Sequence, residues 1–183
     1  MSTVRDAVLA RRSYSSVTDR APSHQELLDL VEAAGRVADH SALHPWRLIE
    51  LRGAAREKLG AAMVTAAEAS GKDAVKLAAK PLRAPLLIGI VASRTPSHKV
   101  PKWEQDAVAS GVAHTLSLLL DDAGWGVMWR TGEHTRTESV AKALGIEEHE
   151  RLMGWLYVGG VPEGKRGATR KPIDGARFVT TID

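Results

Sequence analysis

Apolar residues recur every three or four positions along much of the chain, most clearly at Leu27, Leu30, Val31 and Ala34. This spacing places apolar side chains on one face of an α-helix. A serine or threonine followed three residues later by glutamate marks two helix starts as capping boxes. Helices are therefore expected over residues 4–12, 23–36, 54–70, 103–123 and 135–144.

The remaining apolar residues form short runs bounded by glycine or proline, as in β-strands. The run at 86–92 is continuously apolar, which is typical of a strand buried on both faces. Strands are expected at 46–51, 86–92, 127–130 and 152–161, with strand character also in the tail at 178–182.

The order of these elements predicts an α+β fold, with a mixed central sheet flanked by helices, in one domain over residues 1–183. The prolines within 71–85 and 93–101 make both segments irregular connections. Small residues on the 103–123 helix, including Gly111, allow the sheet or a partner subunit to approach it closely. The tail strand has no obvious partner in its own chain.

The composition narrows the function classes. The chain has no cysteine, which excludes disulfides, thiolate nucleophiles, cysteine zinc sites and iron–sulfur clusters. A net charge of only +3 gives weak steering toward nucleic acid. No apolar run is long enough to span a bilayer, and no apolar leader follows Met1. A cytoplasmic protein without nucleic-acid or membrane partners is expected.

The common nucleotide-binding and hydrolase motifs are missing. Gly124-Trp125-Gly126 lacks the third glycine of a dinucleotide-binding fingerprint and precedes a strand, where the fingerprint needs a helix. No Walker loop, nucleophile elbow or zinc-protease motif occurs.

Candidate ligand-binding groups lie in three separate segments. Arg11-Arg12-Ser13 offers two guanidinium groups and a hydroxyl, which suit a phosphate, although a solvated helix end has the same composition. Arg36 and His40 follow an expected helix. His40 and His44 have the spacing of a zinc pair, but Pro45 opposes the helix that such a pair needs and no third ligand is evident.

The third segment combines aromatic rings, glycines and a cation. Trp129, Arg130 and Thr131 lie between Gly126 and Gly132, where a glycine backbone allows close approach of a flat ring. Tryptophans in strands are also common core residues. A basic stretch near the C-terminus supplies either a solvated face or a phosphate contact, from Lys165, Arg166, Arg170 and Lys171.

Taken in order, these segments resemble the nitroreductase family of FMN-dependent NAD(P)H oxidoreductases, in particular its small bacterial members. The opening Arg-Arg-Ser, the stretch from Arg36 to Trp46 and the stretch from Gly126 to Gly132 are each similar to family motifs. The segment His98-Lys99-Val100-Pro101-Lys102-Trp103-Glu104-Gln105 is similar to a specific motif of this subgroup. The resemblance extends from about Arg11 to Val161.

This resemblance implies a nitroreductase-like homodimer, with the C-terminal segment exchanged onto the partner and two FMN molecules at the interface. Arg11, Arg12 and Ser13 would hold the FMN phosphate and ribityl chain, and Arg170 would meet the phosphate. Arg36 and His40 would reach the cofactor from the same or the partner subunit. The isoalloxazine would be flanked by Trp129, Arg130 and Thr131.

The implied activity transfers hydride from NAD(P)H to flavin N5 and then reduces a nitroaromatic, quinone or similar electron-poor acceptor by a ping-pong mechanism. No catalytic side chain and no metal are required. Alternatives are another flavin chemistry, such as dehalogenation or flavin breakdown, and a flavin carrier without turnover. Ser15, Ala42 and His44 depart from the residues typical of the family, which bears on flavin affinity.

Overall fold

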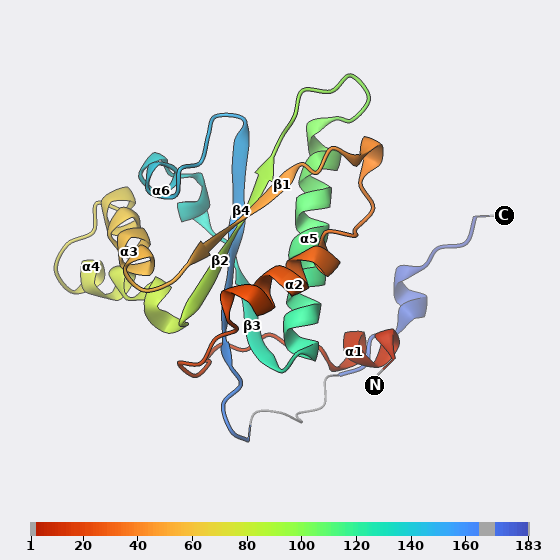
Figure 1. Ribbon diagram of the computed structural model, residues 1–183, viewed down its shortest axis with the longest axis horizontal. Helices are drawn as coiled ribbons and strands as arrows, with labels where there is room; N and C mark the ends of the chain where they lie inside the picture. The colour runs from red at the N-terminus through yellow and green to blue at the C-terminus, as the bar shows by residue number, and fades with distance from the viewer. Residues whose placement is uncertain (1–2, 165–170, 183) are drawn as a thin grey trace.

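The computed structural model describes residues 3–164 and 171–182. Its centre is a four-stranded sheet in the order β1-β2-β4-β3. Helices cover both faces of this sheet (Figure 1). The strands are β1 (Trp46–Leu51), β2 (Leu86–Ser93), β3 (Trp125–Arg130) and β4 (Glu150–Gly160).

All three strand pairs of the described sheet are antiparallel. The helix-and-sheet class expected from the sequence is confirmed, but the sheet formed by the described residues is antiparallel rather than mixed. β2 is buried along nearly its whole length, as its continuous apolar sequence predicts. A register shift between Ile90 and Val91 leaves Gly154 opposite Ile90 and Leu152 opposite Val91.

One face of the sheet is covered by α2 (His24–Ala34) and α5 (Lys102–Asp122). Leu27 and Ala34 of α2 pack with Leu116 of α5 and Val127 of β3 in one apolar cluster. Gly111 of α5 faces the loop after α2 rather than the expected sheet: a Cβ at Gly111 would lie 3.6 Å from Val37. This close approach places that loop directly against α5.

The opposite face carries α3 (Ala54–Ala66), α4 (Gly71–Ala78) and α6 (Glu138–Leu144), seen together at the left of Figure 1. Leu59 and Met63 pack there with Trp155 and Tyr157 of β4. Short 3₁₀ turns complete the described chain, at η1 (His40–Ala42), η2 (Lys80–Arg83), η3 (Glu133–Arg136) and η4 (Gly175–Phe178).

The two ends of the described chain bury little apolar surface. α1 (Val4–Ala10) has no buried residue, and its Val4 and Leu9 are 80% and 64% exposed. Phe178 and Ile182 in the tail are 76% and 92% exposed. Apolar side chains of this size are expected to be covered by another surface.

The structure corrects three expectations. Residues 71–78 form α4 rather than a loop, because Pro81 and Pro85 lie beyond the helix. The helix expected from Thr135 starts at Glu138 with Thr137 as its N-cap, because Thr135 Oγ donates to the Gly132 carbonyl (2.7 Å) instead of capping a helix. The tail contains the η4 turn and no strand among its described residues.

Candidate functional site

The Arg-Arg-Ser segment lies beside the free edge of β3. α1 ends at Ala10, and the amide of Arg11 donates to the Ala7 carbonyl (2.9 Å) as the helix C-cap. The chain then turns toward the sheet, where the amide of Tyr14 donates to the Val127 carbonyl of β3 (3.0 Å). This bond places residues 11–13 next to the strand that leads to Trp129.

Trp129 points toward α5. Its ring meets His114 of α5 edge-on, with ring centroids 4.9 Å apart. The indole passes over Gly154 of β4, where a Cβ would lie 2.6 Å from the indole nitrogen. Gly154 also has φ +132°, so both the backbone and the tryptophan require glycine. The buried indole nitrogen of Trp129 makes no hydrogen bond within the described residues.

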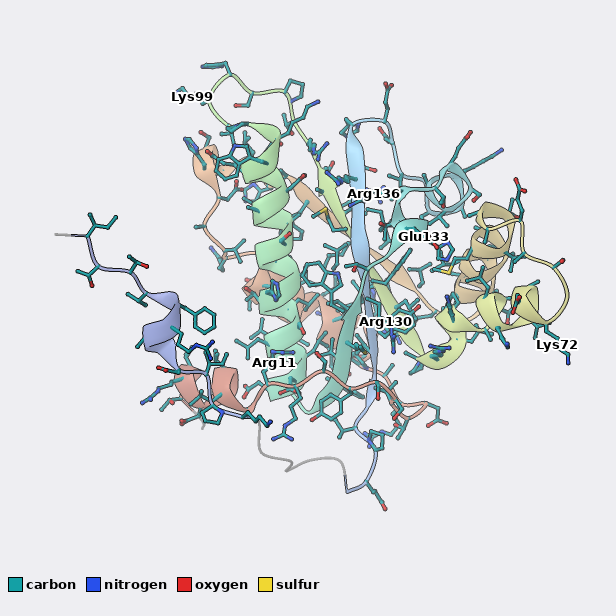
Figure 2. The ribbon with its side chains drawn as sticks, turned by 180° about the vertical axis from the view of Figure 1, so that it is seen from behind. Arg11, Lys72, Lys99, Arg130, Glu133 and Arg136 are labelled. Atoms are coloured by element: carbon teal, nitrogen blue, oxygen red, sulfur yellow. The ribbon has the colours of Figure 1, made fainter. Side chains whose placement is uncertain are left out.

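Arg130 leaves β3 on the opposite face of the sheet, because consecutive strand residues alternate. Its guanidinium carbon lies 5.3 Å from the Tyr157 ring centroid, on the face that also carries α3. Figure 2 shows Arg130 on the side of the strands away from α5. The Trp129 and Arg130 side chains therefore leave β3 on opposite faces, although both residues line one cavity together with Thr131 at the end of the strand.

The backbone after β3 is open. Gly132 has φ +141°, a conformation that side-chain-bearing residues rarely adopt, and no atom lies within 4 Å of a Cβ built on it. Thr131 beside it is exposed. Exposed amides next to a glycine form a surface that a planar ligand can approach closely.

Arg36 and His40 lie in the loop between α2 and β1, and both are exposed. The Nδ1 atom of His40 lies 3.0 Å from a carboxylate oxygen of Glu104, in the first turn of α5. The η1 turn therefore lies at the start of α5.

The same loop holds an unusual backbone. Ser41, Ala42 and His44 have φ values of +65°, +50° and +47°. Asp39 supports this conformation, since its carboxylate accepts from the amide of His44 (2.7 Å) and its carbonyl accepts from the amide of Ala42 (3.0 Å). Non-glycine residues in this region cost free energy and concentrate at functional sites.

The structure brings two of the three sequence segments together. Arg11, Arg12 and Ser13 immediately precede Tyr14, whose amide donates to Val127 of β3, the strand that carries Trp129 and Arg130. α5 has 21 residues, about 30 Å at 1.5 Å per residue. α1 lies by the end of α5 that precedes β3, whereas η1 lies by the opposite end (Figure 1). His40 therefore lies apart from the Arg-Arg-Ser segment in a single chain, whereas Arg36 adjoins Val37, which faces Gly111 in the middle of α5. Arg170 lies outside the described residues.

Two side chains of α5 that make specific contacts, His114 and Gln105, were not predicted as site residues from the sequence. His114, against Trp129, is a helix residue with no motif around it. Gln105 is 1% exposed and holds the 94–101 loop onto α5. Its Oε1 accepts from the amide of Thr95 (2.8 Å), and its Nε2 donates to the carbonyls of Thr95 (2.9 Å) and Val100 (3.1 Å). Its place at the end of the His98–Gln105 motif was the available signal.

Residues 3–164 and 171–182 lack two features, a metal-binding cluster and a membrane-spanning helix. They contain no group of three or more histidine, aspartate or glutamate side chains arranged to hold a metal ion. None of the helices among them combines the length and apolar character needed to cross a bilayer.

Comparison with known proteins places this α+β fold in a family. Residues 8–160 match the sequence profile described as "Nitroreductase family". The chain is 33% identical over 178 residues to the Escherichia coli K12 protein named "Putative NAD(P)H nitroreductase YdjA", covering 96% of this chain and 97% of that one. The protein belongs to the nitroreductase family.

Solved structures agree on the fold. A nitroreductase-like family protein from Bacillus cereus superposes with a TM-score of 0.84 at 21% identity, covering 100% of this chain and 97% of the other. The FMN-dependent nitroreductase NfnB from Mycobacterium smegmatis, solved with NADPH, superposes with a TM-score of 0.74 at 16% identity, covering 98% and 97%.

Proposed function

We propose that this protein is an FMN-dependent oxidoreductase that takes hydride from NAD(P)H and passes it to an electron-poor acceptor, such as a nitroaromatic or quinone, in a ping-pong cycle. Bound FMN supplies the two-electron chemistry, and the protein orients it and tunes its charge. Family membership supports the class of reaction, and the cluster at the β3 edge supports the cofactor.

The residues at the β3 edge fit FMN. Arg11 and Arg12 supply guanidinium groups for its phosphate, and Ser13 supplies a hydroxyl donor. Trp129 offers an aromatic surface for the ring system, and the open backbone at Thr131 and Gly132 offers amide donors to its polar edge. The described part of the chain thus provides a phosphate end and a ring end along one strand edge.

The observation that carries the shared site is the separation of His40 from this edge. His40 lies by the start of α5, while α1 lies by its far end, so a single chain brings only part of the candidate site together. A two-fold dimer packed through α5 can bring the Arg36 and His40 of one protomer to the β3 edge of its partner. The complete site is then shared between two chains.

The exposed ends of the chain support the same dimer. α1 has no buried residue, and the tail exposes Ile173, Phe178 and Val179 by 77%, 76% and 74%. Monomeric proteins rarely leave so many large apolar side chains uncovered along two segments. Exchange of the C-terminal segment onto the partner would cover them.

The purified protein tests this function directly. We expect flavin absorbance, one FMN per chain, and NAD(P)H oxidation with a quinone acceptor that gives parallel lines in double-reciprocal plots. Arg12→Ala is expected to weaken FMN binding by roughly tenfold or more, because a charge-assisted phosphate contact is lost. Arg5→Ala, an exposed arginine on α1, is the matched control.

A protein that stays colourless after FMN addition would rule out the proposal. FMN binding without NAD(P)H oxidation by any acceptor would leave the flavin-carrier alternative instead. If Arg12→Ala retains full FMN affinity, the assigned phosphate contact is wrong.

A further inference from the structure

The outer surface of α4 and η2 is strongly basic. These two elements contain four basic residues and one acidic residue, namely Lys72, Lys76, Lys80, Arg83 and Asp73. The whole chain has 25 basic and 22 acidic residues, so the sequence outside these two elements carries 21 of each sign. The formal net charge of +3 therefore belongs to α4 and η2, while the charges of the remaining sequence balance.

The orientation of α4 directs its cations outward. Leu77 is 7% exposed and packs with Leu59 of α3 in the apolar cluster on that face of the sheet. Lys72 and Lys76 are about one helical turn apart on the side away from Leu77, and both are exposed. Figure 2 shows Lys72 at the outer edge of the molecule, pointing away from the sheet. The single acid, Asp73, lies 3.7 Å from the Lys76 ammonium group, and both side chains are so exposed that this pair is weak.

Apolar side chains lie among these cations. Val75 of α4 is 71% exposed, and Leu82 of η2 is 44% exposed. Val75 is three residues from Lys72 and therefore lies on the same side of the helix. The α4 surface is defined here as the exposed residues Lys72, Val75, Lys76, Lys80, Leu82 and Arg83.

The α4 surface stays accessible in the proposed dimer. α4 lies at one side of the molecule, whereas α1 and the C-terminal segment lie at the other side, with the sheet and α5 between them (Figure 1). A dimer packed through α5, α1 and the tail leaves α4 facing outward. Lys80 and Arg83 also line the cavity at the end of β3, so Lys72, Val75 and Lys76 are the part of the surface outside the candidate flavin site.

We propose that the α4 surface docks this protein onto a lipid bilayer that contains anionic headgroups. The cations would pair with the headgroup phosphates, while Val75 and Leu82 enter the boundary between the headgroups and the acyl chains. An acidic protein or a nucleic acid would also pair with the cations, but neither offers an apolar layer directly beneath its charges. Binding of this kind needs no membrane-spanning segment, and it goes beyond the proposed reaction.

Sedimentation of the FMN-saturated protein with sucrose-loaded vesicles tests the proposal. At about 0.1 M salt, we expect at least roughly tenfold stronger binding to vesicles of phosphatidylcholine and phosphatidylglycerol, mixed at about 7:3, than to vesicles of phosphatidylcholine alone. Raising the salt to about 0.5 M should release the protein, because the added ions screen the headgroup charge.

The double variant Lys72→Gln/Lys76→Gln locates the binding surface. Each cation near an anionic bilayer contributes roughly a fivefold increase in binding, so this variant should bind at least roughly tenfold more weakly than the wild type. Lys99→Gln/Lys102→Gln removes the same charge in and before the first turn of α5 and is the matched control. The control should bind the vesicles like the wild type, and both double variants should keep the NAD(P)H oxidation of the wild type.

The lack of cysteine in the chain allows a second, site-specific measurement. Val75→Cys labelled with acrylodan should emit at shorter wavelength when vesicles with phosphatidylglycerol are added, because the fluorophore leaves water. Lys99→Cys labelled in the same way should keep its emission unchanged.

Four results would overturn the α4 surface as a lipid-binding site. They are equal binding to the two kinds of vesicle, an equal loss in the two double variants, unchanged emission from the label at Val75, and binding to soluble polyglutamate without binding to vesicles. The last of these would indicate an acidic protein partner instead. Flavin absorbance of the same preparations tests the proposed function separately: a colourless protein that binds anionic vesicles refutes the flavin but not the α4 surface.

Discussion

At the residue scale, the loop between α2 and β1 holds strain that a single substitution can relieve. Ala42 has φ +50°, where its Cβ is unfavourable and glycine or asparagine is preferred. Its amide bond to the Asp39 carbonyl does not depend on its side chain.

Ala42→Gly is therefore expected to stabilise the protein by about 0.5–1 kcal/mol, since the left-handed conformation no longer costs free energy. The free energy of unfolding by urea measures this effect. Ala38→Gly, an alanine of the same loop without positive φ, is the matched control and should be neutral or destabilising. A loss of stability at Ala42 equal to that at Ala38 contradicts the strain argument.

A second residue-scale feature is the ion pair that joins β1 to the start of β4. Arg47 donates to both carboxylate oxygens of Glu150, each at 2.6 Å, and the Glu150 side chain is 4% exposed. The hydrogen bonds from Arg47 lower the pKa of Glu150 to about 2, against the opposing effect of burial. The amide of Glu147 adds a further bond to the same carboxylate (3.1 Å).

Because the pKa of Glu150 is lower in the folded protein than in the unfolded chain, its stabilising effect is complete above about pH 4.5 and is lost as the pH falls toward about 2. The effect is on the order of 3 kcal/mol. Glu150→Gln should reduce stability at pH 7 and flatten the pH dependence between 4.5 and 2, measured by urea unfolding at each pH. Glu148→Gln, an exposed neighbour, should leave the pH profile like that of the wild type.

At the scale of elements, the sequence was sufficient to predict a helix start where the residues that cap the helix contact only each other's backbone. Ser23 and Glu26 form both bonds of a capping box, as their spacing predicts, because the two side chains need only each other's backbone. Thr135 and Glu138 have the same spacing but do not, because the Gly132 turn before them directs the Thr135 hydroxyl backward. That turn is a feature of the folded backbone and not of the spacing.

The candidate site was likewise predictable from the sequence only in part. The motifs identify which segments matter, and strand alternation alone could have shown that Trp129 and Arg130 point to opposite faces. The cavity that η2 and β3 line together could not be predicted, because these two elements are distant in sequence and meet only in the fold. The separation of His40 from the β3 edge likewise depends on where α5 places its two ends.

The 94–101 loop is an element whose order depends on one helix side chain. Gln105 makes three hydrogen bonds to this loop from a buried position, so Gln105→Ala leaves several backbone groups without partners. We expect a loss of about 1–3 kcal/mol in unfolding free energy and faster hydrogen exchange at the amide of Thr95. Gln25→Ala, on the exposed surface of α2, should change neither. Unchanged exchange in Gln105→Ala would show that other contacts hold the loop.

At the scale of the whole molecule, the proposed dimer makes a prediction that no single-chain site can satisfy. If Arg12 acts from one protomer and Arg36 from its partner, Arg12→Ala and Arg36→Ala homodimers each lack a contact in every site. A mixed dimer has one site with both arginines and one site with neither. Mixing the two inactive variants after brief unfolding and refolding should therefore restore FMN-dependent NAD(P)H oxidation.

Random reassociation predicts recovery of up to about a quarter of the wild-type activity, since half of the dimers are mixed and half of their sites are complete. Each variant refolded alone is the control and should stay at its own low level. Arg12→Ala mixed with the double variant Arg12→Ala/Arg36→Ala should also show no recovery, because no pairing restores Arg12. If the first mixture remains as inactive as its components, while size-exclusion chromatography of tagged chains shows mixed dimers, then Arg12 and Arg36 act from the same chain. That result would contradict the site shared between two chains.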